Sequence, residues 1–121
     1  MEKVQRIHDV KLDEIYWESV KTGNRRFEVR VNDRDYKEGD TISLHRFGFS
    51  LDPLGFPTKQ YLNCFGEKAS NSEAVDSLNF KITHVFHGSD DNGIKIGYVI
   101  IALSPNPCEV IRDNPKQLTL W

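Results

Sequence analysis

Basic side chains are concentrated in residues 21–34 of a chain whose net charge is −2. This segment contains Lys21, Arg25, Arg26, Arg30 and Arg34. Because its only acidic residues are Glu28 and Asp33, the segment carries a charge of +3 and leaves −5 for the rest of the chain. Guanidinium groups match phosphate oxygens and the edges of bases. The chain as a whole has no attraction for nucleic acid or an anionic membrane, so any such partner must be held by a local patch such as this segment.

Residues 26–31 alternate strictly between polar and apolar types, which predicts a strand with one buried face. We expect the buried face to carry Phe27, Val29 and Val31, and the exposed face to carry Arg26, Glu28 and Arg30. In an extended strand Arg26 and Arg30 are ~13 Å apart, about two phosphate spacings along one nucleic-acid strand. On spacing alone, a solvated strand face with alternating charges is the commoner explanation, and composition does not distinguish it from a binding site.

Glu28 is unusual in this segment because an isolated carboxylate would repel phosphate. Paired with Arg26 and Arg30, it can orient their guanidinium groups, or accept a hydrogen bond from an exocyclic amine, as glutamate does from cytosine. As a general base it would need to reach the reacting atom and usually to have a raised pKa. We expect the neighbouring arginines to lower the pKa of Glu28, which favours a binding role over a catalytic one.

The elements around this segment follow from local signals. Residues 8–13 predict a strand with Val10 and Leu12 on its buried face. A helix is expected next, with Asp13 as its N-cap and Gly23 as its left-handed C-terminal stop. Its expected buried stripe consists of Leu12, Ile15, Tyr16, Ser19 and Val20.

Further strands are predicted in residues 41–47, 79–87 and 97–104, the last of them apolar enough to be buried on both faces. Residues 48–78 are rich in glycine and proline but also in aromatics, and we expect an insertion that partly folds onto the body, with a short strand near residues 60–63. Residues 104–121 are expected to form a C-terminal extension containing at most one helical turn.

At 121 residues the chain fits a single domain. One or two helices among five or six strands predict an α+β or barrel-like domain.

The ordered pattern of residues resembles the ASCH domain group of the PUA-like superfamily, and is most similar to a small bacterial and phage branch of unassigned function. It comprises Lys11 on a strand, a helix ending at Gly23, basic residues, Glu28-x-Arg30, the run from Asn32 to Tyr36, Gly39-Asp40 and Gly97-Tyr98. The resemblance covers most of residues 7–47 and 79–103. It implies a small PUA-like β-barrel with one or two flanking helices and a cleft beside the segment that joins the helix to the next strand.

PUA-like domains typically bind RNA, and ASCH domains are proposed to bind it in that cleft. The resemblance therefore implies that RNA, another single-stranded nucleic acid or a nucleotide binds there. The residues expected to contact it are Lys11, Trp17, Lys21, Arg25, Arg26, Glu28, Arg30, Asn32, Arg34 and Tyr98.

Two other functions remain open. Some small ASCH relatives look like amidohydrolases that act on acetylated cytidine through a lysine, a threonine and a glutamate, and ribonuclease activity has also been suggested. Here Arg25 stands at the lysine position and Glu28 at the threonine position, and arginine is a poor base or nucleophile. Glu28 is the candidate catalytic residue if the protein is an enzyme. The third function is a protein-partner-binding module that uses the aromatic residues of segment 48–78.

The remaining candidates have simpler explanations. His84 and His87 are three residues apart, on opposite faces of a strand and without a third ligand, so we expect no metal, and we expect His84 to be a core residue. Trp17 and Tyr98 can stack on a base, but half-buried packing explains each of them as well. Cys64 and Cys108 suit reduced thiols. No cofactor motif, leader or membrane-spanning run is present, and we expect a cytoplasmic protein.

Overall fold

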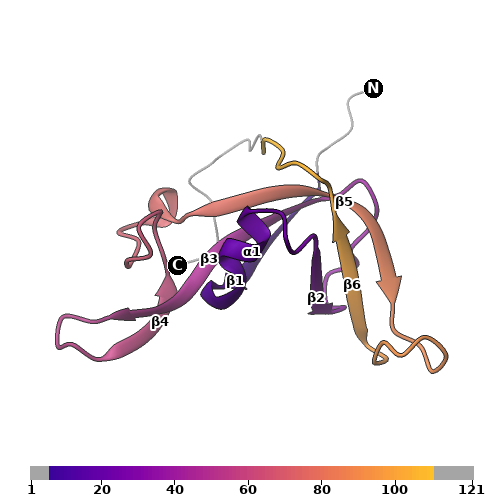
Figure 1. The fold of residues 1–121 in the computed structure, drawn as a ribbon, viewed down its shortest axis with the longest axis horizontal. Coiled ribbons are helices and arrows are strands. Elements are labelled where there is room, and N and C mark those ends of the chain that lie inside the picture. The colour runs from indigo at the N-terminus through magenta and orange to yellow at the C-terminus, as the bar shows by residue number, and fades with distance from the viewer. Residues whose placement is uncertain (1–5, 111–121) are drawn as a thin grey trace.

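The computed structural model describes residues 6–110 and contains one α-helix, six strands and a short 3-10 helix in that range. In chain order these are β1 (Ile7–Asp13), α1 (Glu14–Lys21), β2 (Phe27–Val31), β3 (Thr41–Leu51), β4 (Pro57–Tyr61), η1 (Ser72–Ala74), β5 (Ser77–His87) and β6 (Tyr98–Leu103). The long strands form an arch, with α1 between its two arms (Figure 1). This is the expected α+β class with a mostly β composition.

The six strands form one sheet in the order β1-β3-β5-β6-β2, with β4 added to β3. The β1–β3 pair is parallel and the other pairs are antiparallel. Strands β1 and β2 are the two ends of this path, and no backbone ladder joins them within residues 6–110. The sheet is therefore open between β1 and β2.

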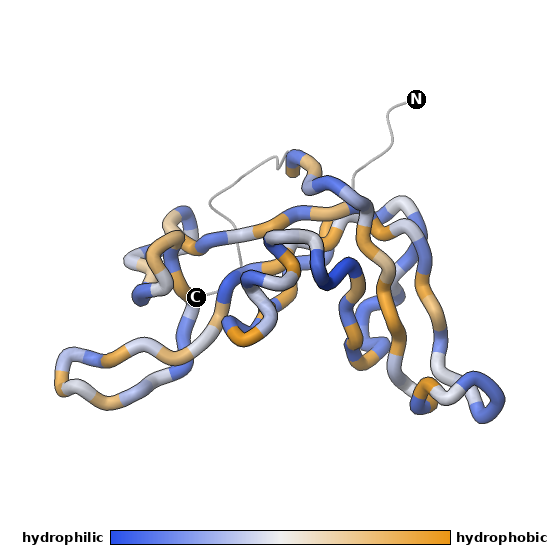
Figure 2. The backbone as a smooth tube through the Cα atoms, viewed as in Figure 1, coloured by the Kyte–Doolittle hydropathy of each residue, from blue (hydrophilic) through white to orange (hydrophobic). Residues whose placement is uncertain are grey.

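The main core lies on the inner side of the curled sheet, under α1. Strand β1 contributes Val10 and Leu12, as predicted, and they pack with Ile42 and Leu44 of β3. The other buried members are Trp17, Val20, Tyr36, Phe80, Ile82, Val99, Ile101 and Leu103. Figure 2 shows an almost continuous hydrophobic stretch along β6. Only one face of β6 is fully buried, because Tyr98, Ile100 and Ala102 are half-exposed, so the prediction of two buried faces was wrong.

Helix α1 has the predicted ends but not the predicted buried stripe. Asp13 Oδ1 accepts a hydrogen bond from the backbone N–H of Ile15, and Gly23 has a φ of 85° just beyond the helix. The buried helical residues are Trp17 and Val20, whereas Ile15 is 75% exposed. Of the predicted stripe, only Val20 is among the buried residues of the helix. A helix of eight residues is too short for the spacing of its apolar residues to show which side faces the core.

The two faces of β2 are opposite to those predicted. Glu28 is only 3% exposed, whereas Phe27, Val29 and Val31 are 42%, 48% and 53% exposed. Glu28 and Arg30 are paired with Ile101 and Val99, two of the most buried residues of β6. Alternation separates the two faces of a strand, but the partner strand decides which face points inward.

His84 was expected in the core and is instead exposed, beside the carboxylate of Glu38. The cause is a shift in the β5–β6 register between Ile82 and His84. An irregularity of this kind turns the following residues to the other face. As a result Ile82 is buried but Phe86 is exposed.

Segment 48–78 is only partly irregular. Strand β3 continues to Leu51, and β4 overlaps the predicted strand at residues 60–63. A second, small core made by Tyr61, Ala69 and Val75, with Phe47 and Ala74 against it, holds this segment together. The helical turn predicted in the tail is absent from residues 104–110, and residues 111–121 lie outside the described range. No helix in the described range is long and apolar enough to cross a membrane.

Candidate functional site

Guanidinium groups bridge the gap between the unpaired edges of β1 and β2. Arg30 Nη1 donates a hydrogen bond to the main-chain oxygen of Lys11 at 3.1 Å. Arg34 Nη1 donates to the main-chain oxygen of Asp9 at 2.6 Å. In a closed sheet, backbone hydrogen bonds between β1 and β2 would occupy this gap. Here arginine side chains span the gap instead, and they place positive charge along it.

Two cavities open along this gap, of about 340 Å³ and about 410 Å³. The first is lined in part by Tyr16, Arg25 and Glu28, the second by Asp9, Arg34 and Tyr61, and both are lined by Lys11 and Arg30. We call the combined depression the β1–β2 groove, defined by Lys11, Arg25, Glu28, Arg30, Arg34 and Tyr61. Four of these six side chains are cations.

Glu28 lies at the base of the groove. Its Oε2 atom accepts a hydrogen bond from Arg30 Nη1 at 3.2 Å, and its Oε1 atom is 3.6 Å from Arg25 Nη2. The second distance is too long for a hydrogen bond, so Oε1 is a buried acceptor without a hydrogen-bond donor among the described residues.

Burial raises the pKa of the Glu28 carboxyl above its ordinary value, although Arg30 and Arg25 act in the opposite direction. The expectation of a lowered pKa was therefore wrong. It assumed a carboxylate on a solvated strand face, whereas the carboxylate lies inside, where the loss of hydration outweighs two nearby positive charges.

Arg25 is held between two aromatic rings. Its guanidinium carbon is 4.2 Å from the ring centre of Tyr16 and 4.7 Å from that of Phe27. Stacking of this kind fixes the plane of the guanidinium group. Arg25 is therefore positioned over Glu28, and its buried Nε atom has no hydrogen-bond partner among the described residues.

Lys11 stands where the two cavities meet. Its Nζ atom lies 4.5 Å from the ring centre of Phe47 and 5.8 Å from that of Tyr61. The side chain is exposed, so its ammonium group remains available to a ligand while the rings restrict where it points.

The polar residues that line these cavities but were not among the predicted contacts are Asp9, Asp13, Tyr16 and Tyr61, and Tyr36 lies close to Arg30 without lining either cavity. The hydroxyl of Tyr36 is buried without a hydrogen-bond partner among the described residues, and burial raises its pKa while the charge of Arg30 opposes this. Asp9 alternates with Lys11 on the outward face of β1, which is the one sequence signal that could have identified it. Tyr61 comes from a distant segment, and only the β3–β4 pairing brings it to the groove.

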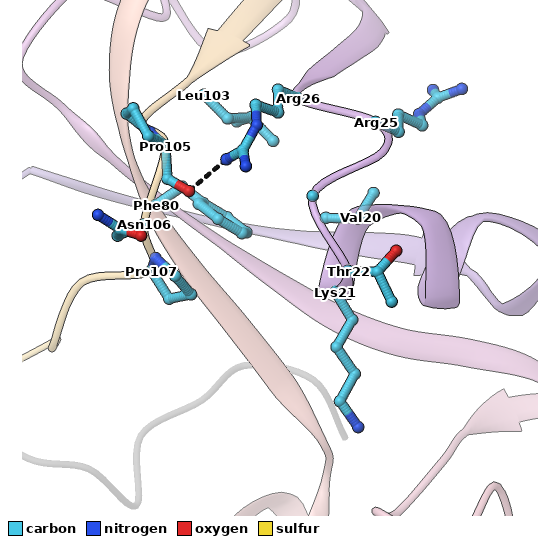
Figure 3. Close-up of a pocket in the computed structure, with 11 residues that line it drawn as sticks. Val20, Lys21, Thr22, Arg25, Arg26, Phe80, Leu103, Pro105, Asn106 and Pro107 are labelled. Atoms are coloured by element: carbon cyan, nitrogen blue, oxygen red, sulfur yellow. Dashed lines mark hydrogen bonds between the residues drawn. The ribbon is translucent and has the colours of Figure 1, made fainter.

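Lys21 and Arg26 line a different cavity, of about 180 Å³, between the end of α1 and the segment after β6. Figure 3 shows Arg26 pointing toward Pro105, whose main-chain oxygen accepts its hydrogen bond, while Arg25 points away. Lys21 and Arg26 therefore belong to this cavity and not to the groove, whereas Arg25 lines both.

Three other predicted contacts do not reach the groove. Trp17 is 2% exposed and belongs to the main core, so its indole has no free face for a base. Asn32 is exposed in a turn where its backbone N–H binds the oxygen of Gly97. Tyr98 is paired with Val31, on the face of β2 and β6 opposite to Glu28.

A chain of polar side chains crosses β1, β3 and β5 beside the groove. His45 Nε2 is 2.7 Å from Asp9 Oδ1, and His45 Nδ1 is 2.7 Å from Ser77 Oγ. These are the residue types of a nucleophilic triad. Ser77 lines none of the three cavities described here, however, so the chain is best explained as a structural link between strands. Within residues 6–110 no three His, Cys, Asp or Glu side chains are grouped closely enough to hold a metal ion.

Residues 7–103 match the family described as a domain of unknown function, DUF3850, and the chain belongs to this family. The match includes segment 48–78 and stops before the predicted extension at 104. The chain is also similar to an uncharacterized 12.9 kDa protein encoded in the GpA 3′ region of Escherichia phage P2, with 45% identity over 42 residues. That similarity covers 35% of this chain and 38% of the phage protein.

Proposed function

We propose that this member of the DUF3850 family binds RNA, another single-stranded nucleic acid or a nucleotide in the β1–β2 groove. The observation that carries the proposal is the surroundings of Glu28. Its Oε1 atom is buried, lies 3.6 Å from Arg25 Nη2 and has no hydrogen-bond donor among the described residues, in a groove that also holds Lys11, Arg30 and Arg34. The cations suit phosphate, and Oε1 suits an N–H group once a movement of Arg25 uncovers it. A nucleotide of adenine, cytosine or guanine offers both, whereas a simple anion offers only the first.

The other carboxylates of the groove do not compete for this role. Asp9 is bound to His45, and Asp13 caps α1 and lies 3.5 Å from Lys59 Nζ. Glu28 also has partners, Arg30 and Arg25, but its Oε1 atom receives no hydrogen bond from the described residues, and we propose that the ligand engages this atom.

The open sheet supports the further proposal of a PUA-like, barrel-related fold of the ASCH group. Its end strands β1 and β2 face each other across a groove that Arg30 and Arg34 bridge. In such a fold the ligand would bind in the gap between β1 and β2, where the barrel is not closed.

One observation favours a second function, hydrolysis of a modified nucleoside of the acetylated cytidine type or of RNA. The raised pKa of Glu28 suits a general acid or base better than the lowered value expected from the sequence. Arg25, however, occupies the position of the lysine in the amidohydrolase-like relatives, and a guanidinium group fixed between two rings is a poor nucleophile.

The test is a titration of labelled single-stranded RNA and DNA homopolymers by fluorescence anisotropy over a range of salt concentrations. Binding should weaken with salt, because phosphates release counterions. Arg34→Gln should flatten the slope of log affinity against log salt by about 0.7 if Arg34 contacts one phosphate of a single strand. Lys95→Gln is the matched control, since Lys95 lies beside Tyr98, outside the groove.

Absence of binding at low salt, or an equal effect of Lys95→Gln, would remove the nucleic-acid proposal. The same preparations are screened for hydrolysis of acetylated cytidine and of single-stranded RNA. Turnover by the wild type that Glu28→Gln abolishes while binding survives would place the enzymatic function first.

A further inference from the structure

The β3–β4 hairpin projects from the body as an arm of the arch (Figure 1). Beyond the small core at Phe47 and Tyr61, the paired positions are Phe49 with Lys59 and Leu51 with Pro57. Figure 2 shows hydrophobic residues along this arm, away from the main core. Phe49 is 63% exposed.

One face of the hairpin includes residues at the groove. Alternate residues of a strand share a face, so Phe49 lies on the same side as Phe47, and Lys59 on the same side as Tyr61. Tyr61 lines the groove itself, and Phe47 lies under the ammonium group of Lys11. The outer part of the arm therefore lies on the same side of the hairpin as the residues that it contributes to the groove.

The outer part of this face also combines an aromatic ring with a positive charge. Lys59 Nζ lies 5.4 Å from the ring centre of Phe49 and 3.5 Å from Asp13 Oδ2, which connects the arm to the start of α1. A ring that can stack on a base beside an ammonium group that can meet a phosphate is the combination found on surfaces that bind single strands.

The spacing along the arm fits the same partner. Side chains at alternate positions of a strand are about 7 Å apart, roughly twice the ~3.4 Å rise between stacked bases. One base can therefore be accommodated between neighbouring side chains of this face, beside Phe49. A protein partner would also cover exposed apolar residues, but it would not explain why they share a side of the hairpin with residues at a groove of cations.

We propose that the outer part of this hairpin face, formed by the exposed residues Phe49, Leu51, Pro57 and Lys59, is a stacking platform for nucleotides that extend beyond the β1–β2 groove. The inference rests on the proposed function of the groove and specifies its ligand. The ligand is a single strand several nucleotides long, and a mononucleotide occupies only part of the surface.

The experiment compares oligonucleotides of about three and about twelve nucleotides, lengths that match the groove alone and the groove with the arm. The wild-type protein should bind the longer one more tightly. Phe49→Ala should weaken binding of the longer oligonucleotide by about five- to a hundred-fold, because one base loses its stacking partner. Binding of the shorter one should be unchanged.

Phe86→Ala is the matched control, because Phe86 is an exposed phenylalanine of β5 that is paired with Ile100 of β6 and not with the β3–β4 hairpin. Lys59→Gln should flatten the salt dependence by about 0.7 for the longer oligonucleotide only. Both Phe49 and Lys59 are well exposed, so these variants should fold normally, which is checked by circular dichroism.

The outcomes separate the two proposals. Equal affinity for both lengths, or no effect of Phe49→Ala, overturns the platform and leaves the groove standing. Failure to bind either length overturns both. If sedimentation finds a wild-type dimer that Phe49→Ala dissociates, the arm is an interface between copies of this chain and the platform is overturned.

Discussion

Arg30 donates from the same Nη1 atom to the main-chain oxygen of Lys11, at 3.1 Å across the gap between β2 and β1, and to Glu28 Oε2 on its own strand, at 3.2 Å. One guanidinium group thus holds the two unpaired edges of the sheet together and balances the buried carboxylate. The groove depends on this side chain for both its shape and its charge.

Removing Arg30 should therefore cost stability through two contacts at once. Arg30→Gln should lower the free energy of unfolding by about 2 kcal/mol, since hydrogen bonds to charged groups contribute about 1.5–3 kcal/mol. Part of this loss comes from leaving Glu28 buried with a weaker partner. The double variant, which also carries Glu28→Gln, should accordingly lose less free energy of unfolding than the two single variants lose together. We expect this difference to exceed about 0.5 kcal/mol. Urea unfolding of the four proteins measures this cycle, and strictly additive losses would show that the two side chains do not interact.

The raised pKa of Glu28 predicts how stability depends on pH. The folded protein binds the Glu28 proton more tightly than the unfolded chain does, so folding takes up a proton between the two pKa values. This contribution to stability is complete below about pH 4, the ordinary range of a glutamate, and is lost as the pH rises through the folded pKa.

Glu28→Gln removes the titrating group, so the stability of the wild type relative to this variant should decrease with rising pH over that range. Urea unfolding at several pH values gives the difference directly, with Glu73→Gln, an exposed glutamate on η1, as the control. A relative stability that instead increases with pH would mean that Arg25 and Arg30 outweigh the loss of hydration.

Arg46 connects α1 to the irregular part of segment 48–78. Its Nε and Nη2 atoms donate to both oxygens of Glu14, each at 2.6 Å, and Nη1 is 3.4 Å from Asp76 Oδ2. Arg46→Met should lower the free energy of unfolding by about 1–3 kcal/mol, because two carboxylates lose a shared, largely buried partner.

Lys37→Met is the comparison, since Lys37 and Asp35 form an ion pair whose side chains are both mainly exposed. It should cost less than about 1 kcal/mol. Thermal or urea unfolding compares the two variants, and equal losses would show that the Arg46 cluster contributes no more than a surface pair.

At position 23 a side chain would meet two obstacles, the positive φ of the backbone and the nearby side chain of Arg26. The φ of Gly23 is 85°, and a Cβ atom there would lie 2.6 Å from Arg26 Nη2. Gly55 has the same φ of 85°, but an added Cβ atom there would meet nothing within 4 Å. Gly23→Ala should therefore destabilise the protein by more than Gly55→Ala, which should cost about 1–2 kcal/mol for the backbone strain alone. Equal losses in urea unfolding would show that Arg26 moves aside freely.

Local signals in the sequence determined the elements of this protein. Asp13 caps α1 and Gly23 ends it, as predicted, because capping depends only on residues within one turn. The alternation in residues 26–31 likewise predicted β2, because the two faces of a strand follow from its geometry alone. Of the basic residues around Glu28, Arg25, Arg30 and Arg34 line the groove, whereas Lys21 and Arg26 do not.

The tertiary structure alone decided which way these residues face. Glu28 points inward because β2 pairs with β6 opposite Ile101, and His84 points outward because the β5 register shifts after Ile82. Neither pairing can be derived from a residue's neighbours in sequence. Lys11 and Tyr61 share the groove for the same reason, since β3 pairs with both β1 and β4. Strand pairing between distant segments, which depends on burying the whole core at once, placed this charged strand face in an open groove with a buried carboxylate at its base.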